Sequence, residues 1–159
     1  MKTREIKIVV LEFENIGELS EDDQLLLAEA RRITGLAYAP YSGFHVGAAV
    51  LLANGQIITG NNQENAAYPS GLCAERVALF YANANYPDSA VKAIAISAAK
   101  NGVLVNDTVK PCGSCRQVLA EAEVRYDTPI RVILDGQDSI YVLKGIESLL
   151  PLSFSKRAL

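Results

Sequence analysis

The spacing of apolar residues alternates between two periods along this chain, and the two periods predict strands and helices in turn. Short runs rich in β-branched residues favour strands, whereas longer amphipathic runs favour helices. The pattern predicts strands at residues 5–14, 46–53, 56–60, 91–98, 130–134 and 139–143, and helices from Ser20 to about Gly35, at 73–84 and at 115–124, with a helical turn at 147–150. Strands that alternate with helices in one small chain indicate a layered α/β or α+β fold.

Two local signals support these boundaries. Ser20 precedes three acidic residues and the first long helical pattern, as in a capping box, and acids favour the positive end of a helix dipole. Asn54-Gly55 lies between two apolar runs and is the strongest short signal for a β-hairpin. We therefore expect a helix that begins after Ser20 and a tight hairpin at residues 54–55.

Length and composition limit the possible classes of protein. The chain has 159 residues, of which half are apolar, so we expect a single domain over residues 1–159 with its own core. A net charge of −3 without a cluster of Lys or Arg argues against a nucleic-acid partner. No apolar run approaches the roughly 20 residues of a membrane helix, and no signal-peptide pattern is visible. We therefore expect no membrane partner and a cytoplasmic location.

All three cysteines fall in two short motifs, Cys73-Ala74-Glu75 and the segment 111–115 that holds Cys112 and Cys115. Three thiolates can bind one zinc ion and leave one coordination position open for water. Zinc makes such a water acidic enough to attack at neutral pH, and Glu75 lies close enough to the first ligand to move its protons. The pattern predicts a hydrolytic deaminase with one Zn²⁺ on Cys73, Cys112 and Cys115, and Glu75 as the catalytic acid and base.

The charge of such a site needs compensation. Both motifs precede predicted helices, whose amino-terminal amides stabilise thiolates. Zn²⁺ with three thiolates still carries a net charge of −1, which weakens its Lewis acidity. Arg76 and Arg116 each follow a motif directly. We therefore predict that at least one of them donates a hydrogen bond to a thiolate.

Other chemistries remain open at this point. Cys112 and Cys115 could form a redox dithiol, although the motif at Cys73 would then have no explanation. His45 is the only histidine, so it could complete a closed structural zinc site. We favour a surface or supporting role for His45. A zinc-stabilised binding module without activity is a further alternative.

Taken together, the motifs resemble the cytidine deaminase family in its small form with three cysteine ligands. The resemblance covers about residues 30–155 and is carried by segments 37–44, 46–49, 60–68, 73–76 and 111–118, and by Leu149-Leu150-Pro151 with Phe154. It implies a three-layer α/β fold with a five-stranded mixed sheet covered by helices. It also implies a homotetramer whose active sites are shared between subunits. Residues 1–20 extend beyond the usual start, and we assign them no role.

The resemblance also implies an activity, the hydrolytic deamination of cytidine and 2′-deoxycytidine to uridine and 2′-deoxyuridine with release of ammonia, in pyrimidine salvage. The partner is then a small pyrimidine nucleoside. A related enzyme acting on another aminopyrimidine nucleoside, such as blasticidin S, would use the same zinc and glutamate. A polynucleotide deaminase needs a basic channel with stacking aromatics, and this chain has neither a basic cluster nor any tryptophan.

Substrate-binding positions follow from the same resemblance. Asn62 and Glu64 match residues that hydrogen-bond the ribose hydroxyls, and Phe44 matches an aromatic that lines the pyrimidine site. The backbone at Ala74 matches a contact to the amide edge of the base. Residues that match positions reaching into a neighbouring subunit's site are Ala66, Tyr68 and Phe154.

Overall fold

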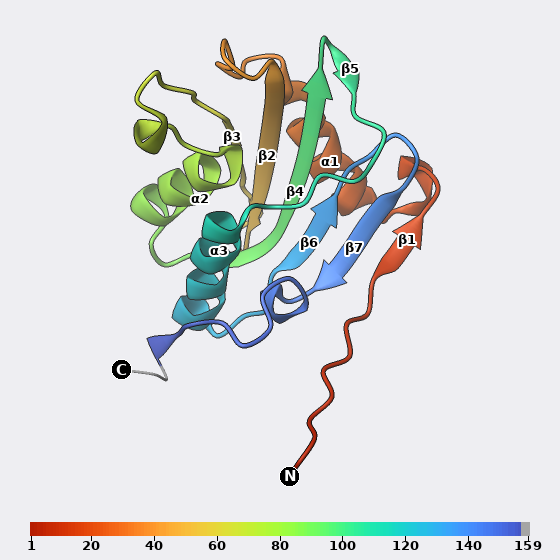
Figure 1. Ribbon diagram of the computed structural model, residues 1–159, viewed down its shortest axis with the longest axis vertical. Coiled ribbons are helices and arrows are strands. Elements are labelled where there is room, and N and C mark those ends of the chain that lie inside the picture. Colours follow the sequence, from red (N-terminus) through yellow and green to blue (C-terminus); the bar gives the residue numbers. More distant parts are fainter. Residues whose placement is uncertain (157–159) are drawn as a thin grey trace.

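A mixed β-sheet forms the centre of the molecule (Figure 1) in the computed structural model, which describes residues 1–156. Its strands are β1 (Leu11–Phe13), β2 (Phe44–Leu52), β3 (Ile57–Asn61), β4 (Val91–Lys100), β5 (Val103–Leu104), β6 (Arg131–Leu134) and β7 (Ile140–Lys144). The strand order is β1-β7-β6-β4-β2-β3, and β5 pairs with β4. Among the paired strands of residues 1–156, only β4 and β6 run parallel.

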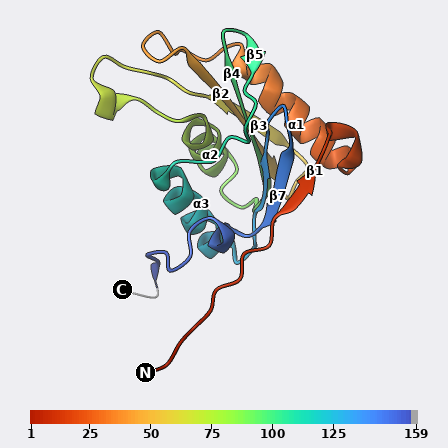
Figure 2. The same ribbon diagram turned by 45° about the vertical axis from the view of Figure 1, so that its right-hand side comes forward.

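Helices cover both faces of the sheet, as Figure 2 shows. They are α1 (Glu21–Thr34), α2 (Ala74–Asn85) and α3 (Gly113–Tyr126), with short 3-10 turns η1 (Ile16–Glu18), η2 (Tyr68–Ser70) and η3 (Ile146–Ser148). One buried apolar cluster joins α1 to the sheet, and a larger one joins α2 and α3 to the opposite face. The predicted three-layer α/β fold is therefore confirmed. Among the described residues, no helix is both long enough and apolar enough to cross a membrane.

The structure confirms the predicted helix start after Ser20 and the predicted hairpin at Asn54-Gly55. The hydroxyl of Ser20 accepts a hydrogen bond from the amide of Asp23 at 3.3 Å, and Gly35 follows the last residue of α1. Asn54-Gly55 lies in the β2–β3 hairpin, where Gly55 has a φ of +84°. Such a φ suits glycine, which has no Cβ to clash with the backbone.

Two expectations about the sheet were wrong. The expected strand at residues 5–14 is reduced to β1, and the sheet has seven strands within residues 1–156 rather than five. Leu11 pairs with Val142, and β7 ends only two residues later at Lys144. Most of segment 5–10 therefore has no neighbouring strand to pair with. The two additional strands are the short β1 and β5, which contain three and two residues.

A glycine allows the helix that carries the first cysteine motif to lie directly on the sheet. A Cβ placed on Gly60 in β3 would lie 2.5 Å from the amide nitrogen of Ala78 and 2.7 Å from the carbonyl oxygen of Ala74. Both atoms belong to the backbone of α2 and cannot rotate away. The absence of a side chain at Gly60 therefore lets the first turns of α2 pack directly against β3.

We predict that Gly60→Ala lowers the free energy of unfolding by about 1–3 kcal/mol, because the added methyl group forces α2 away from β3. Urea unfolding of the purified chain measures this change. Gly35→Ala is the matched control, because its Cβ would meet the carbonyl oxygen of Arg32 at an ordinary 3.7 Å. The control should stay within about 0.5 kcal/mol of the unchanged protein. Equal stability of the two variants would contradict the packing argument.

Candidate active site and metal centre

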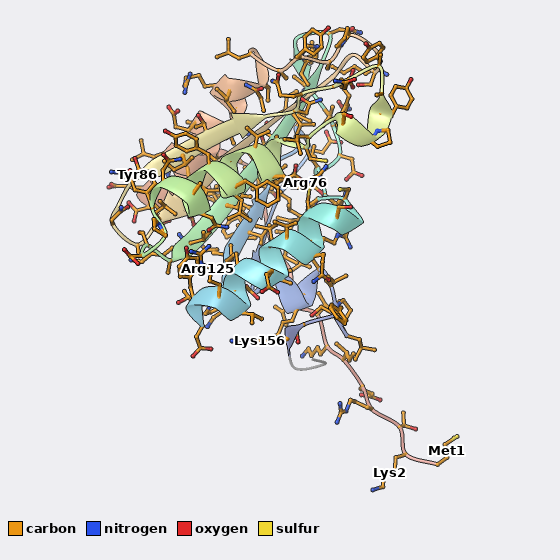
Figure 3. All side chains as sticks on the ribbon, turned by 90° about the vertical axis from the view of Figure 1, so that its left-hand side faces the viewer. Met1, Lys2, Arg76, Tyr86, Arg125 and Lys156 are labelled. Carbon is orange, nitrogen blue, oxygen red and sulfur yellow. The ribbon has the colours of Figure 1, made fainter. Side chains whose placement is uncertain are left out.

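The two cysteine motifs lie at helix amino termini on the same face of the sheet. Cys73 is the N-cap residue of α2, Cys112 is the N-cap residue of α3, and Cys115 lies in the first turn of α3. Figure 3 shows Arg76 where the start of α2 approaches the start of α3. Unpaired amides at both helix starts therefore surround the three sulfur atoms and favour their negative charge.

The geometry of the three sulfur atoms fits one tetrahedral metal ion. The Sγ atoms of Cys73 and Cys112 are 3.9 Å apart, those of Cys112 and Cys115 are 3.5 Å apart, and all three lie within 4.8 Å of one another. Zinc–sulfur bonds of about 2.3 Å in a tetrahedron place sulfur atoms roughly 3.8 Å apart. His45 does not belong to this group in residues 1–156, so the closed site with histidine is not supported. Three protein ligands are the arrangement of a catalytic rather than a structural zinc site.

The thiols of Cys73 and Cys115 differ in pKa. A hydrogen bond with Cys115 is the main cause that lowers the pKa of Cys73 to about 5, and Arg76 and Cys112 lower it further against the effect of burial. The same hydrogen bond, together with burial, raises the pKa of Cys115. The cluster therefore favours a negatively charged sulfur at Cys73. Metal binding must still release protons, because cysteine ligates as the thiolate.

The two arginines that follow the motifs have different roles. Arg76 donates a hydrogen bond from Nη2 to the Sγ of Cys73 at 3.7 Å, which confirms the predicted contact with a thiolate. Arg116 instead donates to the carbonyl oxygens of Pro111 and Leu149, both at 2.8 Å. It therefore ties the loop before α3 to the carboxy-terminal segment and makes no hydrogen bond to sulfur in the described part of the chain.

Glu75 is the second residue of α2 and is only 5% exposed. Burial is the main cause that raises the pKa of its carboxyl group, and the negative charge of Cys73 raises it further. A carboxyl group with a raised pKa can both hold and release a proton near neutral pH. The local geometry therefore suits Glu75 to the predicted role in proton transfer.

A cavity of about 610 Å³ opens beside the cysteine cluster. This volume falls within the roughly 300–1,000 Å³ of small-molecule sites. The residues from the sequence-predicted site that line it are Phe44, Asn62, Glu64, Tyr68, Cys73, Ala74, Glu75 and Cys112. Cys115 is fully buried and does not line the cavity, and Ala66 and Phe154 lie outside the lining and are exposed to solvent. The structure thus brings most, but not all, of the predicted residues to one cavity.

Asn62 holds β2 in place at the wall of this cavity. Its Oδ1 accepts from the amide of Val46 at 2.8 Å, and its Nδ2 donates to the carbonyl oxygen of Phe44 at 2.9 Å. Both ends of the side chain are therefore engaged with the strand that carries Phe44. Any contact of Asn62 with a ligand must use its remaining hydrogen-bonding capacity.

Glu64 is held by the loop before β2. Its carboxylate accepts hydrogen bonds from the amides of Tyr41 and Ser42, at 2.9 and 3.3 Å, and from the hydroxyl of Ser42. The hydroxyl of Ser42 is the main cause that lowers the pKa of Glu64, followed by the amide of Tyr41. Glu64 therefore faces the cavity as a carboxylate at neutral pH.

The sequence did not identify several residues that line the cavity, and two of them, Ser42 and Lys110, are charged or orient a charged group. It assigned no role to Ser42, which orients Glu64, although Ser42 lies inside one of the matched motifs. It also missed Lys110, which lines the cavity and pairs with Asp107 at 2.9 Å. Its position directly before Pro111 and the Cys-x-x-Cys motif was the available signal.

Comparisons with known proteins agree with this site. The family described as the cytidine and deoxycytidylate deaminase zinc-binding region matches residues 20–127. A cytidine deaminase of Sporosarcina psychrophila is 40% identical over 146 residues, covering 87% of this chain and 95% of the relative. One of Halalkalibacterium halodurans is 47% identical over 103 residues, covering 63% and 71%.

A solved structure shows the same relationship in three dimensions. The crystal structure of a cytidine deaminase from Burkholderia pseudomallei matches with a TM-score of 0.72 and 36% identity, covering 86% of this chain and all of the other. The fold and the cluster of three sulfur atoms define a zinc-binding deaminase domain with one zinc ion per chain. The chain belongs to the cytidine and deoxycytidylate deaminase family.

We predict that Arg76→Gln weakens zinc binding by about 10–100-fold, because the charge on the Cys73 thiolate loses its hydrogen-bonding cation. Competition with a chromophoric chelator measures the affinity. Arg116→Gln is the matched control: it should lower the melting temperature, through two lost hydrogen bonds, while zinc affinity changes little. If Arg76→Gln binds zinc and turns over substrate as well as the unchanged protein, its proposed effect on the metal is wrong.

Proposed function

We propose that this chain is a cytoplasmic cytidine deaminase of pyrimidine salvage. It hydrolyses cytidine and 2′-deoxycytidine to uridine and 2′-deoxyuridine and releases ammonia. Its substrate is a free nucleoside rather than a nucleic acid. The single observation that carries this proposal is the convergence of three sulfur ligands and the buried Glu75 at one ligand-sized cavity. Relatives at 40% and 47% identity that are named cytidine deaminase support it.

The three cysteines and Glu75 have separate roles in the reaction. Zinc, when bound to Cys73, Cys112 and Cys115, supplies the Lewis acidity that activates a water molecule for attack at neutral pH. Glu75 takes a proton from that water and gives it to N3 of the pyrimidine ring, which makes C4 more electrophilic. The oxygen of the water bonds to C4. Glu75 then moves the second proton of that oxygen to the amino group, and the C4–N bond breaks to release ammonia. The atoms balance, because one water replaces the amino group by oxygen.

Burial of Glu75 assists both transfers. A carboxyl group in ordinary solvent would lose its proton well below neutral pH. The raised pKa of Glu75 favours the protonated carboxyl group, which is the form that delivers a proton to the ring. The position of Glu75 at the start of α2, two residues after Cys73, brings it to the same side of the cavity as the metal ligands.

Charges in the cavity favour a nucleoside over a nucleotide. Arg76 and Lys110 are the only cations in its lining among the described residues. Arg76 is engaged with Cys73, and Lys110 is paired with Asp107. A 5′-phosphate would have to compete with these two anions for the cations, and the carboxylate of Glu64 would repel it.

We assign the ends of the nucleoside as follows. Glu64 accepts hydrogen bonds from ribose hydroxyls, with Asn62 beside it, and Phe44 contacts the pyrimidine ring. The backbone of Ala74, which precedes Glu75, contacts the amide edge of the base. The rigid support of Glu64 by Ser42 favours this arrangement, because an orienting group is most effective when it is already held in place.

We further propose that the enzyme assembles as a homotetramer with shared active sites. Tyr68 and Phe154 are large side chains that are 76% and 63% exposed, and Ala66 is exposed as well. Exposed aromatic side chains near a cavity are suited to contact a neighbouring subunit. Such contacts would complete the walls of the cavity from outside.

Ammonia release from the zinc-loaded protein tests the activity. We expect turnover of cytidine and 2′-deoxycytidine, accompanied by the fall in ultraviolet absorbance of the cytosine ring. Deoxycytidylate should react far more slowly, because the carboxylate of Glu64 repels its phosphate and both cations of the cavity already contact anions, and blasticidin S should also be a poor substrate. A zinc-loaded protein that releases no ammonia from either nucleoside would refute the proposed function.

Glu75→Gln tests the mechanism separately. The variant should retain one zinc per chain but lose about 10²–10⁴-fold in kcat, because the amide cannot carry the two protons. Metal analysis and steady-state rates measure the two properties. Glu121→Gln, an exposed carboxylate on α3, is the matched control and should leave the rate unchanged. Full activity of zinc-loaded Glu75→Gln would remove this residue from the mechanism.

A further inference from the structure

Residues 2–10 form an extended arm that leaves the body of the molecule at β1 (Figures 1 and 3). The arm pairs with no strand in residues 1–156. Its apolar side chains Ile6, Ile8, Val9 and Val10 are between 42% and 58% exposed. It also lies outside the residues 20–127 that match the family. Its β-branched sequence is therefore that of a strand without a partner.

The strand that the arm extends is itself an open edge. β1 is the last strand of the sheet order and pairs on one side only, with β7. An exposed edge that bears apolar side chains is a template for pairing with another chain. The arm and the free side of β1 together offer one continuous unpaired strand over residues 2–14.

The even-numbered positions of this strand have a symmetrical pattern. They read Lys2, Arg4, Ile6, Ile8, Val10, Glu12 and Glu14. Alternate residues of a strand share one face, so these side chains form a row with two cations, three apolar residues and two anions. The four charged groups make no ion pair within the described residues. When two copies of this row run antiparallel, the cations of each copy face the anions of the other and the apolar residues face one another.

We propose that two copies of this chain associate through antiparallel pairing of residues 2–14 about a two-fold axis at Ile8. Arg4 of each copy then faces Glu12 of the other, Lys2 faces Glu14, and Ile6 faces Val10. An isologous contact of this kind repeats every interaction twice. Ile8 faces its own counterpart on the axis.

Backbone geometry permits this register. In an antiparallel pair of identical strands, facing residues must point their side chains to the same face, so their numbers must sum to an even value. Pairing about Ile8 satisfies this condition. Residues 3–5 of the second copy lie beside β1, whose other side is already held by β7. The new ribbon is thus anchored at each end to a complete sheet, which a lone two-stranded ribbon lacks.

Reversal of charge tests the register on the full zinc-loaded chain. We expect Arg4→Glu and Glu12→Arg each to weaken the association at least ~10-fold, because symmetry places each like-charge pair at two positions. The doubly changed chain, R4E with E12R, restores opposite charges and should associate within ~3-fold of the unchanged protein. Sedimentation equilibrium measures the association, whether it joins single chains or assemblies formed by the body.

Lys7→Glu is the matched control. It makes the same change of charge on the arm, but in this register Lys7 faces the apolar Val9. It should therefore change the association less than ~3-fold. A loss as large as that of Arg4→Glu would show that only the overall charge of the arm matters and would overturn the register.

Cross-linking gives an independent measurement. In the proposed register residue 8 lies opposite itself, with Cβ atoms about 4.5–5.5 Å apart. Ile8→Cys should therefore form a disulfide-linked dimer with oxidised glutathione. Thr3→Cys, which faces Phe13 and lies far from its own counterpart, should not.

Other results would overturn the proposal. Equal association of the unchanged protein and both single variants would mean that the arms do not pair. Failure of the double change to restore association would exclude the facing of residues 4 and 12. If the arm instead binds vesicles containing phosphatidylserine and the chains do not associate through it, its partner is a lipid surface, and the proposal is wrong.

Discussion

The meeting of two helix amino termini at one point is the constraint on which the rest of the site depends. Cys73 comes from the start of α2, and Cys112 and Cys115 come from the start of α3, almost 40 residues later in the chain. Their sulfur atoms fall within 4.8 Å of one another only because both helices pack on the same face of the sheet. The close approach of α2 to Gly60 positions the start of α2, and the hydrogen bond from Arg116 to Leu149 positions the start of α3.

This meeting point also sets the electrostatics of the site. Three sulfur atoms at one position concentrate negative charge, which the helix amides and Arg76 partly offset. Burial is the main cause that raises the pKa of Glu75, and the negative charge of Cys73 raises it further. The cysteine cluster and the proposed proton-transfer group are therefore electrostatically coupled. The negative charge of Glu64, in contrast, is stabilised by hydrogen bonds from amides and a hydroxyl of the loop before β2.

The sequence predicted best what depends on neighbouring residues. The cap at Ser20, the hairpin at Asn54-Gly55 and the clustered cysteines follow from local patterns, and the structure agrees with each. The prediction of a strand over residues 5–14 was wrong, because the length of the paired strand depends on where β7 ends, more than 100 residues away. The local sequence also could not distinguish the roles of Arg76 and Arg116. Each follows a cysteine motif, and only the packing of the carboxy-terminal segment gives Arg116 backbone carbonyls to bind.

The two proposed kinds of contact between subunits lie toward different edges of the sheet. The cavity draws its lining from β2 and from the loops that follow β3 and precede α3, whereas β1 lies at the opposite end of the strand order. Contacts through Tyr68 would close the cavity, but pairing through residues 2–14 would join molecules at an edge remote from it. The arm can therefore change how copies assemble while the zinc ligands and Glu75 keep their positions. A segment outside the matched family region can add an assembly step in this way because it extends an open sheet edge and leaves the active site unchanged.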